Sequence, residues 1–186
     1  VLLIDGTTLQ MGAGDAGTGG AISADGSRVV GTSGALAAAW DAAYPPALAL
    51  LYEEPSATMA WGVNGDGTIA VAESPTGPRK LDLLSLTATP MAGAPTDVPR
   101  AVSTANGFLA VGVCGQPMPQ ACVWDDTNVY SLAGTSPPPW PGFTGSLPAG
   151  VDHLRTALDI SADGRVIVGT AIMNDGARRA FKLTSP

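Results

Sequence analysis

Two cysteines are the first residues of this chain whose type and spacing could do chemistry. Cys114 and Cys122 flank seven residues that include a glycine and two prolines, with apolar, strand-like sequence on both sides. If these strands pair as a hairpin, the two thiols face each other across its loop, and a disulfide would stabilise the hairpin by about 2–3 kcal/mol. A redox or metal site would need a CxxC spacing or a nearby histidine, which this segment lacks. We therefore predict a structural disulfide and an oxidising compartment.

The single histidine is the next candidate for chemistry. His153 follows Asp152 in a segment that we interpret as an inserted loop. A Ser-His-Asp or Cys-His site would need His153 as its base, but adjacent Asp and His side chains rarely orient each other as such a site requires. The chain also has no GxSxG nucleophile motif. We predict no catalytic residue and no enzyme, with His153 as a solvated residue that can contact a ligand or partner. A glycan lyase or hydrolase is the third-ranked alternative.

Aspartate–glycine pairs could indicate calcium. Five aspartates precede a glycine, at Asp5, Asp25, Asp66, Asp163 and Asp175. The stretch "NGDGT" has the alternating oxygens of a calcium loop, but Pro75 stands where an EF-hand places its glutamate. Because aspartate and glycine are also the ordinary residues of tight turns, turn chemistry explains all five pairs. We predict no metal and no cofactor, with calcium as the alternative.

The aromatic residues divide into two groups. Trp40 and Trp124 recur at equivalent places and are predicted to pack in a core, as is Trp61. Trp140 and Phe143 lie instead in the proline-rich stretch "SPPPWPGF". Prolines hold such a loop extended, and an exposed aromatic residue on it suits sugar stacking or a protein contact. The alternative is that the loop folds back over the rest of the molecule.

Charge excludes some partners. The 186 residues carry a formal net charge of −7 with 13% charged residues, so a polyanion would be repelled and we predict no nucleic-acid partner. The most apolar stretch, "GALAAAWDAAYPPALALLY", is interrupted by Asp41 and two prolines, and no uninterrupted run reaches the roughly 20 residues of a spanning helix. We predict no transmembrane segment. Because the chain begins at Val1, we expect that a leader was removed or that the sequence is a fragment.

One short phrase, "ISADG", occurs twice and reveals a repeat. Four related sites have the sequences "AISADGSRVVGTS", "GVNGDGTIAVAES", "VSTANGFLAVGVC" and "DISADGRVIVGTA". Their turn glycines are Gly26, Gly67, Gly107 and Gly164, so the period is about 40 residues and the last interval contains an insertion. An Asp-Gly or Asn-Gly pair between apolar segments predicts a β-hairpin with a two-residue loop.

Each repeat continues beyond its hairpin. A third strand ends in a large apolar residue, usually followed by aspartate, and a fourth strand follows. Four short strands in about 40 residues are typical of a propeller blade, and no window has a helical apolar period. We predict an all-β protein, a β-propeller or propeller-like array of about four four-stranded repeats. The predicted segments are closing strands at 1–17, repeat 1 at 18–56, repeat 2 at 57–98, repeat 3 at 99–134, a proline-rich insertion at 135–155 and an incomplete repeat 4 at 156–186.

The two ends of the chain are complementary. The last repeat stops after its third strand, "RRAFKLTSP", whereas the N-terminal "VLLIDGTTLQMG" supplies spare strands. We predict that one spare strand completes the last repeat, and its residues are Thr7, Thr8, Leu9, Gln10 and Met11. It would do so either in its own chain, which closes the ring, or in a neighbouring molecule, which propagates a fibre. The alternative is that the chain is a segment of a longer propeller.

The segment from "LLIDGTTLQMG" to "AISADGSRVVGTSGALAAAWD" resembles the bacterial extracellular repeat named HAF. That repeat combines an apolar-Asp-Gly strand, an Ala-x-x-Ile-Asn/Ser-x-x-Gly turn, a Val-Val-Gly strand and a His-Ala-Phe sequence. "RAFKL", which begins at Arg179, lies where His-Ala-Phe would be, whereas "AAAWD", "RKLDL" and "QACVWD" depart from it. The resemblance implies a propeller-like fold and a secreted or surface-bound protein. It implies no active-site residue.

The predicted function is that of a secreted or cell-surface structural or adhesive module that acts through surface contacts. Low charge, many small residues and a spare terminal strand favour packing with copies of itself and, by strand addition, extension into a filament. The alternative is a carbohydrate-binding propeller that takes glycans at the Trp140 loop.

Overall fold

The computed structural model contains only strands, turns and loops in the part of the chain that it describes. The described residues are 2–4, 7–11, 17–42, 47–105, 107–115, 117–132, 147 and 149–184. Seventeen strands within these ranges form four sheets, numbered here 1 to 4 in chain order. The predicted all-β class is confirmed.

Each sheet is built from strands that follow one another along the chain. Sheet 1 has the order β1-β2-β6-β5-β4-β3, with β1 (Leu2–Ile4), β2 (Thr7–Met11), β3 (Thr18–Ile22), β4 (Arg28–Ser33), β5 (Leu36–Asp41) and β6 (Ala47–Glu54). Sheet 2 contains β7 (Met59–Val63), β8 (Ile69–Glu73), β9 (Arg79–Asp82) and β10 (Thr87–Pro90). Sheet 3 contains β11 (Val98–Ser103), β12 (Leu109–Cys114), β13 (Gln120–Trp124) and β14 (Val129–Ser131). Sheet 4 contains β15 (Val151–Ile160), β16 (Val166–Met173) and β17 (Arg178–Thr184).

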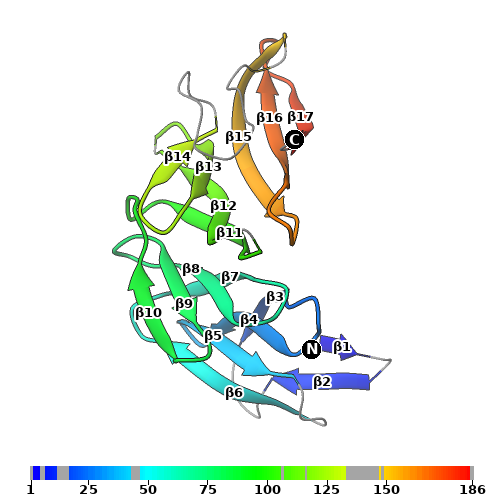
Figure 1. Cartoon of the computed structure of the whole chain (residues 1–186), viewed down its shortest axis with the longest axis vertical. Helices are drawn as coiled ribbons and strands as arrows, with labels where there is room; N and C mark the ends of the chain where they lie inside the picture. Colours follow the sequence, from blue (N-terminus) through cyan, green and yellow to red (C-terminus); the bar gives the residue numbers. More distant parts are fainter. Residues whose placement is uncertain are drawn as a thin grey trace.

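The four sheets follow one another around an open arc and do not close into a ring (Figure 1). Three apolar cores lie between consecutive sheets. Alternation along the strands builds them, because successive side chains point to opposite faces of a sheet. In β8, for example, Ala70 and Ala72 pack toward sheet 1, whereas Val71 packs toward sheet 3. Trp40 and Trp124 are 1% and 0% exposed, as the prediction of core tryptophans requires.

The repeated Asp-Gly turns are four-residue loops, so the prediction of two-residue loops is wrong. The Ser23 N–H donates to the Arg28 carbonyl at 2.9 Å, and the Gly26 N–H donates to the Ser23 carbonyl at 2.9 Å. A two-residue type I′ loop needs positive φ at both central residues. In this loop only Gly26 has a positive φ, at 73°. Equivalent backbone hydrogen bonds close the loops at 64–69 and 161–166.

The repeated phrase "ISADG" supplies side-chain acceptors for the same loop. Ser23 Oγ accepts the Arg28 N–H at 3.0 Å, and Ser161 Oγ accepts the Val166 N–H at 2.9 Å. Asn64 holds the same position in the second repeat, where its Oδ1 accepts the equivalent N–H at 2.9 Å. These side chains support the backbone where each hairpin turns. The phrase therefore recurs because the same loop recurs.

The innermost strand of every sheet contains a β-bulge at the same position. One residue in each of β3, β7 and β11 is skipped in the register with the second strand of its sheet, whereas β15 skips three, Asp152, Arg155 and Leu158. The skipped residues nearest the repeated turns are Gly20, Trp61, Arg100 and Leu158, and we call these four the bulged residues. Because a bulge redirects a side chain, the fold presents one residue of each repeat toward the inside of the arc.

A small residue on the second strand lies opposite the residue that precedes each of the four bulged residues. A Cβ added at Gly169 would lie 2.0 Å from the Thr156 carbonyl oxygen, and at Gly31 and Gly112 the equivalent distances are 1.9 and 2.1 Å. Ala72 is the counterpart in sheet 2. The glycine of the repeated "VVG", "VGV" and "IVG" stretches is therefore needed for the close approach of the bulged strand.

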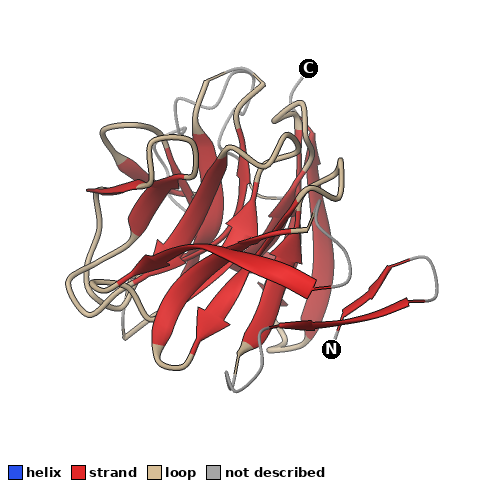
Figure 2. Ribbon diagram, turned by 90° about the horizontal axis from the view of Figure 1, so that it is seen from below, coloured by secondary structure: helices blue, strands red, loops and turns tan. Residues whose placement is uncertain are grey.

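The N-terminal strand does not complete the last sheet of its own chain. β2 pairs in parallel with β6, through Gln10 with Ala47 and Met11 with Leu48, and β1 pairs with β2. The β1–β2 hairpin projects from the body of the molecule (Figure 2). The predicted closure within the chain is thus corrected. Sheets 1 and 4 lie at opposite ends of an open arc, so β2 cannot reach β17 and pairs instead with β6, the fourth strand of its own sheet. Completion of a neighbouring molecule stays a prediction.

Candidate functional site

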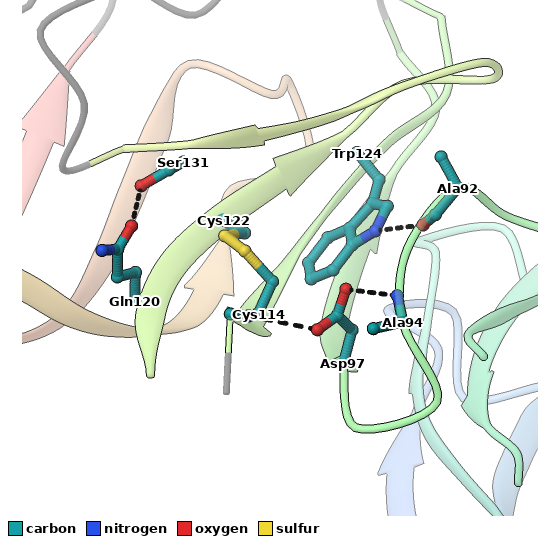
Figure 3. The surroundings of a disulfide bond; sticks show 9 residues. Ala92, Ala94, Asp97, Cys114, Gln120, Cys122, Trp124 and Ser131 are labelled. Atoms are coloured by element: carbon teal, nitrogen blue, oxygen red, sulfur yellow. Dashed lines mark hydrogen bonds between the residues drawn. A yellow bond between two sulfur atoms is a disulfide. The ribbon is translucent and has the colours of Figure 1, made fainter. Parts of the chain in front are cut away.

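The disulfide prediction is confirmed. Cys114 and Cys122 are bonded, with their Cα atoms 5.9 Å apart, and they join β12 to β13 (Figure 3). They are diagonal neighbours in the ladder, because Cys122 lies opposite Gly112 and Cys114 lies opposite Gln120. Beside the bond, the Asp97 carboxylate accepts the Gly115 N–H at 3.2 Å and the Ala94 N–H at 2.8 Å. The disulfide therefore fixes the hairpin end where sheet 3 meets the loop from sheet 2.

Replacing both cysteines by serine is expected to lower the free energy of unfolding by about 2–3 kcal/mol, because the unfolded chain regains the entropy of the open loop. Urea unfolding monitored by tryptophan fluorescence measures the change. Wild-type protein unfolded in dithiothreitol is the control, and its midpoint should fall to that of the double variant. An unchanged midpoint in both experiments would contradict the prediction.

The structure describes one of the three residues predicted to contact a ligand, His153, but not Trp140 or Phe143. Trp140 and Phe143 lie outside the described residues, so the glycan alternative stays a prediction. His153 does not lie in a loop: it is the third residue of β15, and the strand occupies the last five positions of the predicted insertion. The prediction of a loop at His153 is therefore corrected, because residues 151–160 form one continuous strand that pairs with β16. His153 Nδ1 lies 2.8 Å from Asp152 Oδ2.

The aspartates of the repeated turns are held by their own loops. Ser23 and Ser27 hydroxyl groups and the Ser27 N–H donate to Asp25, which lowers the pKa of that carboxyl to about 2. The pKa values of Asp66 and Asp163 are also lowered, first by the hydroxyl groups of the neighbouring threonine and serine. Within the described part of the chain no three His, Cys, Asp or Glu residues are placed to hold a metal ion.

A cavity of about 410 Å³ lies along the inside of the arc. The innermost strands of all four sheets line it, and the four bulged residues are among the lining residues. Neighbouring inner strands approach closely there: a Cβ added at Gly20 would lie 2.5 Å from the Ala60 carbonyl oxygen, and one at Gly62 would lie 2.6 Å from the Arg100 carbonyl oxygen. The repeat therefore builds a channel wall of four similar strands whose bulged residues differ in type. We call this cavity the inner channel.

Two bulged residues form a stacked pair in the inner channel. The Arg100 guanidinium carbon lies 3.8 Å from the centroid of the Trp61 ring. The Trp61 Nε1–H donates to Glu73 Oε2 at 3.0 Å, which fixes the indole. Burial lowers the pKa of Arg100, while the negative charge of Glu73 raises it. The guanidinium stays charged, because arginine titrates far above neutral pH. The arrangement is a cation held flat against an aromatic ring at the wall of a cavity.

Sheets 1 and 4 also line the inner channel. Ile22 and Leu158 are exposed by 45% and 52%, so they present apolar surface to it. Asp159 Oδ1 accepts the Ile160 N–H at 2.8 Å. The second oxygen of Asp159 has no hydrogen-bond partner among the described residues. Cationic, acidic and apolar groups thus line one cavity.

Sequence reasoning missed this site. Trp61 was predicted to pack in a core, but it is half-buried at the channel wall, and Arg100 was not singled out. A signal was present, since the bulged residue falls six positions before the turn glycine in three repeats and seven before it at Arg100. It could not be used without knowledge of the bulge.

The free edge of sheet 4 is a second unusual feature. Within the described residues, β17 is the outermost strand of a three-stranded sheet, and most of its own residues are exposed. Its counterparts β5 and β13, which are the third strands of sheets 1 and 3, are mostly buried. We call the outer edge of β17 the free edge.

No family model matches this chain, and no curated protein sequence matches it. Among solved structures, TolB from Acinetobacter baumannii is similar with a TM-score of 0.58 and 15% sequence identity. The chain has a β-propeller-like fold. The match covers 91% of this chain and 41% of that TolB chain, so this chain spans about two fifths of its length. At this identity the likeness establishes the fold alone. In addition, no helix within the described ranges is long and apolar enough to cross a membrane.

Proposed function

We propose that this protein is a non-enzymatic structural module outside the cytoplasm that assembles with copies of itself through the free edge of sheet 4. The observation that carries the proposal is the exposure of β17. In sheets 1 to 3 the third strand pairs with a fourth strand, whereas β17 lies at the edge of sheet 4 among the described residues. Exposed edges present unpaired backbone groups and are ready sites for strand addition.

The donor in this proposal is the N-terminal hairpin of another copy. β1 and β2 form a hairpin that projects from the first sheet (Figure 2). In sheets 1 to 3 the fourth strand is antiparallel to the third, so a donated strand should run antiparallel to β17. One copy would thus extend the sheet of the next, and repetition of the same contact would give a filament.

Charge supports a specific partner at this edge. β17 contains Arg178, Arg179 and Lys182, three of the nine basic residues in a chain whose net charge is −7. Basic residues on an edge strand discourage indiscriminate pairing. An acidic partner compensates them, and another copy of this chain is acidic overall.

The proposed location is the cell surface or the extracellular medium. The disulfide supports a compartment outside the reducing cytosol, since disulfides persist in oxidising surroundings. The resemblance to the extracellular HAF repeat points in the same direction.

Deletion of residues 1–11 tests the assembly. Wild-type protein should increase in weight-average mass above its 18.6 kDa monomer as its concentration rises, and negative-stain electron microscopy should reveal filaments. The deleted variant has no donor and should remain monomeric. It keeps β17, so a small amount of it should cap wild-type filaments and shorten them.

Reversing the charge of an edge residue with Lys182→Glu should weaken assembly, whereas Arg165→Glu on an exposed turn is the matched control. A wild-type protein that stays monomeric at its highest soluble concentration would disprove self-assembly.

A further inference from the structure

The inner channel has the size and the chemistry of a small-molecule site. Its volume of about 410 Å³ falls within the range of ligand pockets, about 300–1,000 Å³. It is lined by backbone and side chains of the innermost strands, which are held by three packed cores. A cavity on rigid strands costs little to organise when a ligand enters. It lies on the inside of the arc, whereas the free edge lies on the outermost strand of sheet 4.

Arg100 is oriented for an anion. Its guanidinium stacks on Trp61 with 3.8 Å to the ring centroid, and it donates no hydrogen bond to a protein acceptor among the described residues. Stacking occupies a face of the guanidinium but leaves its N–H groups free at the edge of the plane. Those donors match a planar carboxylate, which accepts two parallel hydrogen bonds.

The other groups that line the inner channel limit the chemistry of the ligand further. Asp159 has one oxygen on the Ile160 N–H and the other without a protein partner in the described part of the chain, so it can accept from a hydroxyl or ammonium group. Ile22 and Leu158 provide apolar contact. Arg100 already covers a face of the Trp61 ring, which leaves less of that indole for sugar stacking. The carboxylate is thus the main point of recognition.

We propose that the inner channel binds a small organic acid, with its carboxylate on Arg100 and a hydroxyl or ammonium donor on Asp159. A uronic acid and a free amino acid both carry this combination. The shared chemistry is a carboxylate and a hydrogen-bond donor on one small body.

Calorimetric titration with glucuronate and with leucine tests the site. At least one acid should bind saturably, and its neutral or amide counterpart, glucose or leucinamide, should bind at least about tenfold more weakly, because the charged hydrogen bonds to Arg100 are lost. The acid that binds identifies the source of the carboxylate. The Trp61 indole N–H resonance, assigned with Trp61→Phe, should shift during the titration and locate the ligand. Absence of saturable binding by both acids would overturn the proposal.

Variants separate this site from general effects of charge. Arg100→Gln should raise the Kd at least about tenfold, and Arg165→Gln on an exposed turn should leave it unchanged. Arg100→Lys keeps the charge but loses the planar pair of donors, so its Kd should lie between those of the wild type and Arg100→Gln. Circular dichroism checks the fold of each variant. If Arg100→Gln does not fold, Arg100→Lys and the wild-type comparison of acid with counterpart decide the question. A Kd unchanged by Arg100→Gln in a folded protein would overturn the proposal.

Discussion

Replacement of Trp124 by alanine should lower the free energy of unfolding by about 3–5 kcal/mol. The side chain is 0% exposed and lies in the core between sheets 2 and 3. Its Nε1–H donates to the Ala92 carbonyl at 2.8 Å, so the indole also connects the third sheet to the loop that leaves the second (Figure 3). Alanine would leave a cavity between two sheets and a carbonyl without its donor, and both effects destabilise the folded state.

Equilibrium urea unfolding followed by far-UV circular dichroism measures this loss. Trp124→Phe is the matched control: it keeps most of the ring but removes the N–H donor, so it should cost less than alanine. Trp61→Ala should also cost less, because Trp61 is half-buried at the channel wall and belongs to none of the three cores. If Trp124→Ala is no more destabilising than Trp61→Ala, the sheets are not held together as the structure indicates.

Gly169→Ala should destabilise the protein by about 2–4 kcal/mol, although it adds one methyl group. The added Cβ would lie 2.0 Å from the Thr156 carbonyl oxygen and 2.6 Å from Phe181 Cε1. A backbone oxygen cannot turn aside as a flexible side chain can, so β15 or β16 must move. The strain would fall on the bulge that presents Leu158 to the inner channel.

Sheet 2 provides the control for this substitution. Ala72 occupies the position equivalent to Gly169 and is fully buried, so this sheet accommodates a Cβ at that place. Ala72→Gly should therefore cost only about 1 kcal/mol, from greater freedom of the unfolded chain and loss of a buried methyl group. Thermal unfolding of both variants measures the difference. Equal losses would mean that the bulge does not set the requirement for glycine.

The sequence predicted the repeat well because its strongest signals are local. A turn glycine with positive φ, such as Gly26, and a serine two residues before an aspartate are required by the loop itself, whatever surrounds it. Apolar alternation likewise follows from the strand, as Ala70 and Val71 illustrate by packing in different cores. The disulfide was predictable for the same reason, since both cysteines lie near one hairpin end.

The site was less predictable, because it combines residues from different repeats. Arg100 and Trp61 are 39 positions apart and belong to different sheets, yet the Arg100 guanidinium stacks on the Trp61 ring. Nothing in either strand indicates the other. The bulges that turn both side chains inward arise from pairing with the second strands of their sheets. Such a register irregularity has no local sequence rule comparable to that of a turn.

By itself, the sequence determined the strand class, the period of the units, the positions of their turns and the covalent link between Cys114 and Cys122. Only the tertiary structure decided that the arc stays open, that β2 joins β6 rather than β17, and that four bulges meet around one cavity. The physical reason is the range of the interactions. Turn geometry and side-chain alternation depend on neighbours along the chain, whereas edge pairing and channel lining depend on how the sheets pack against one another.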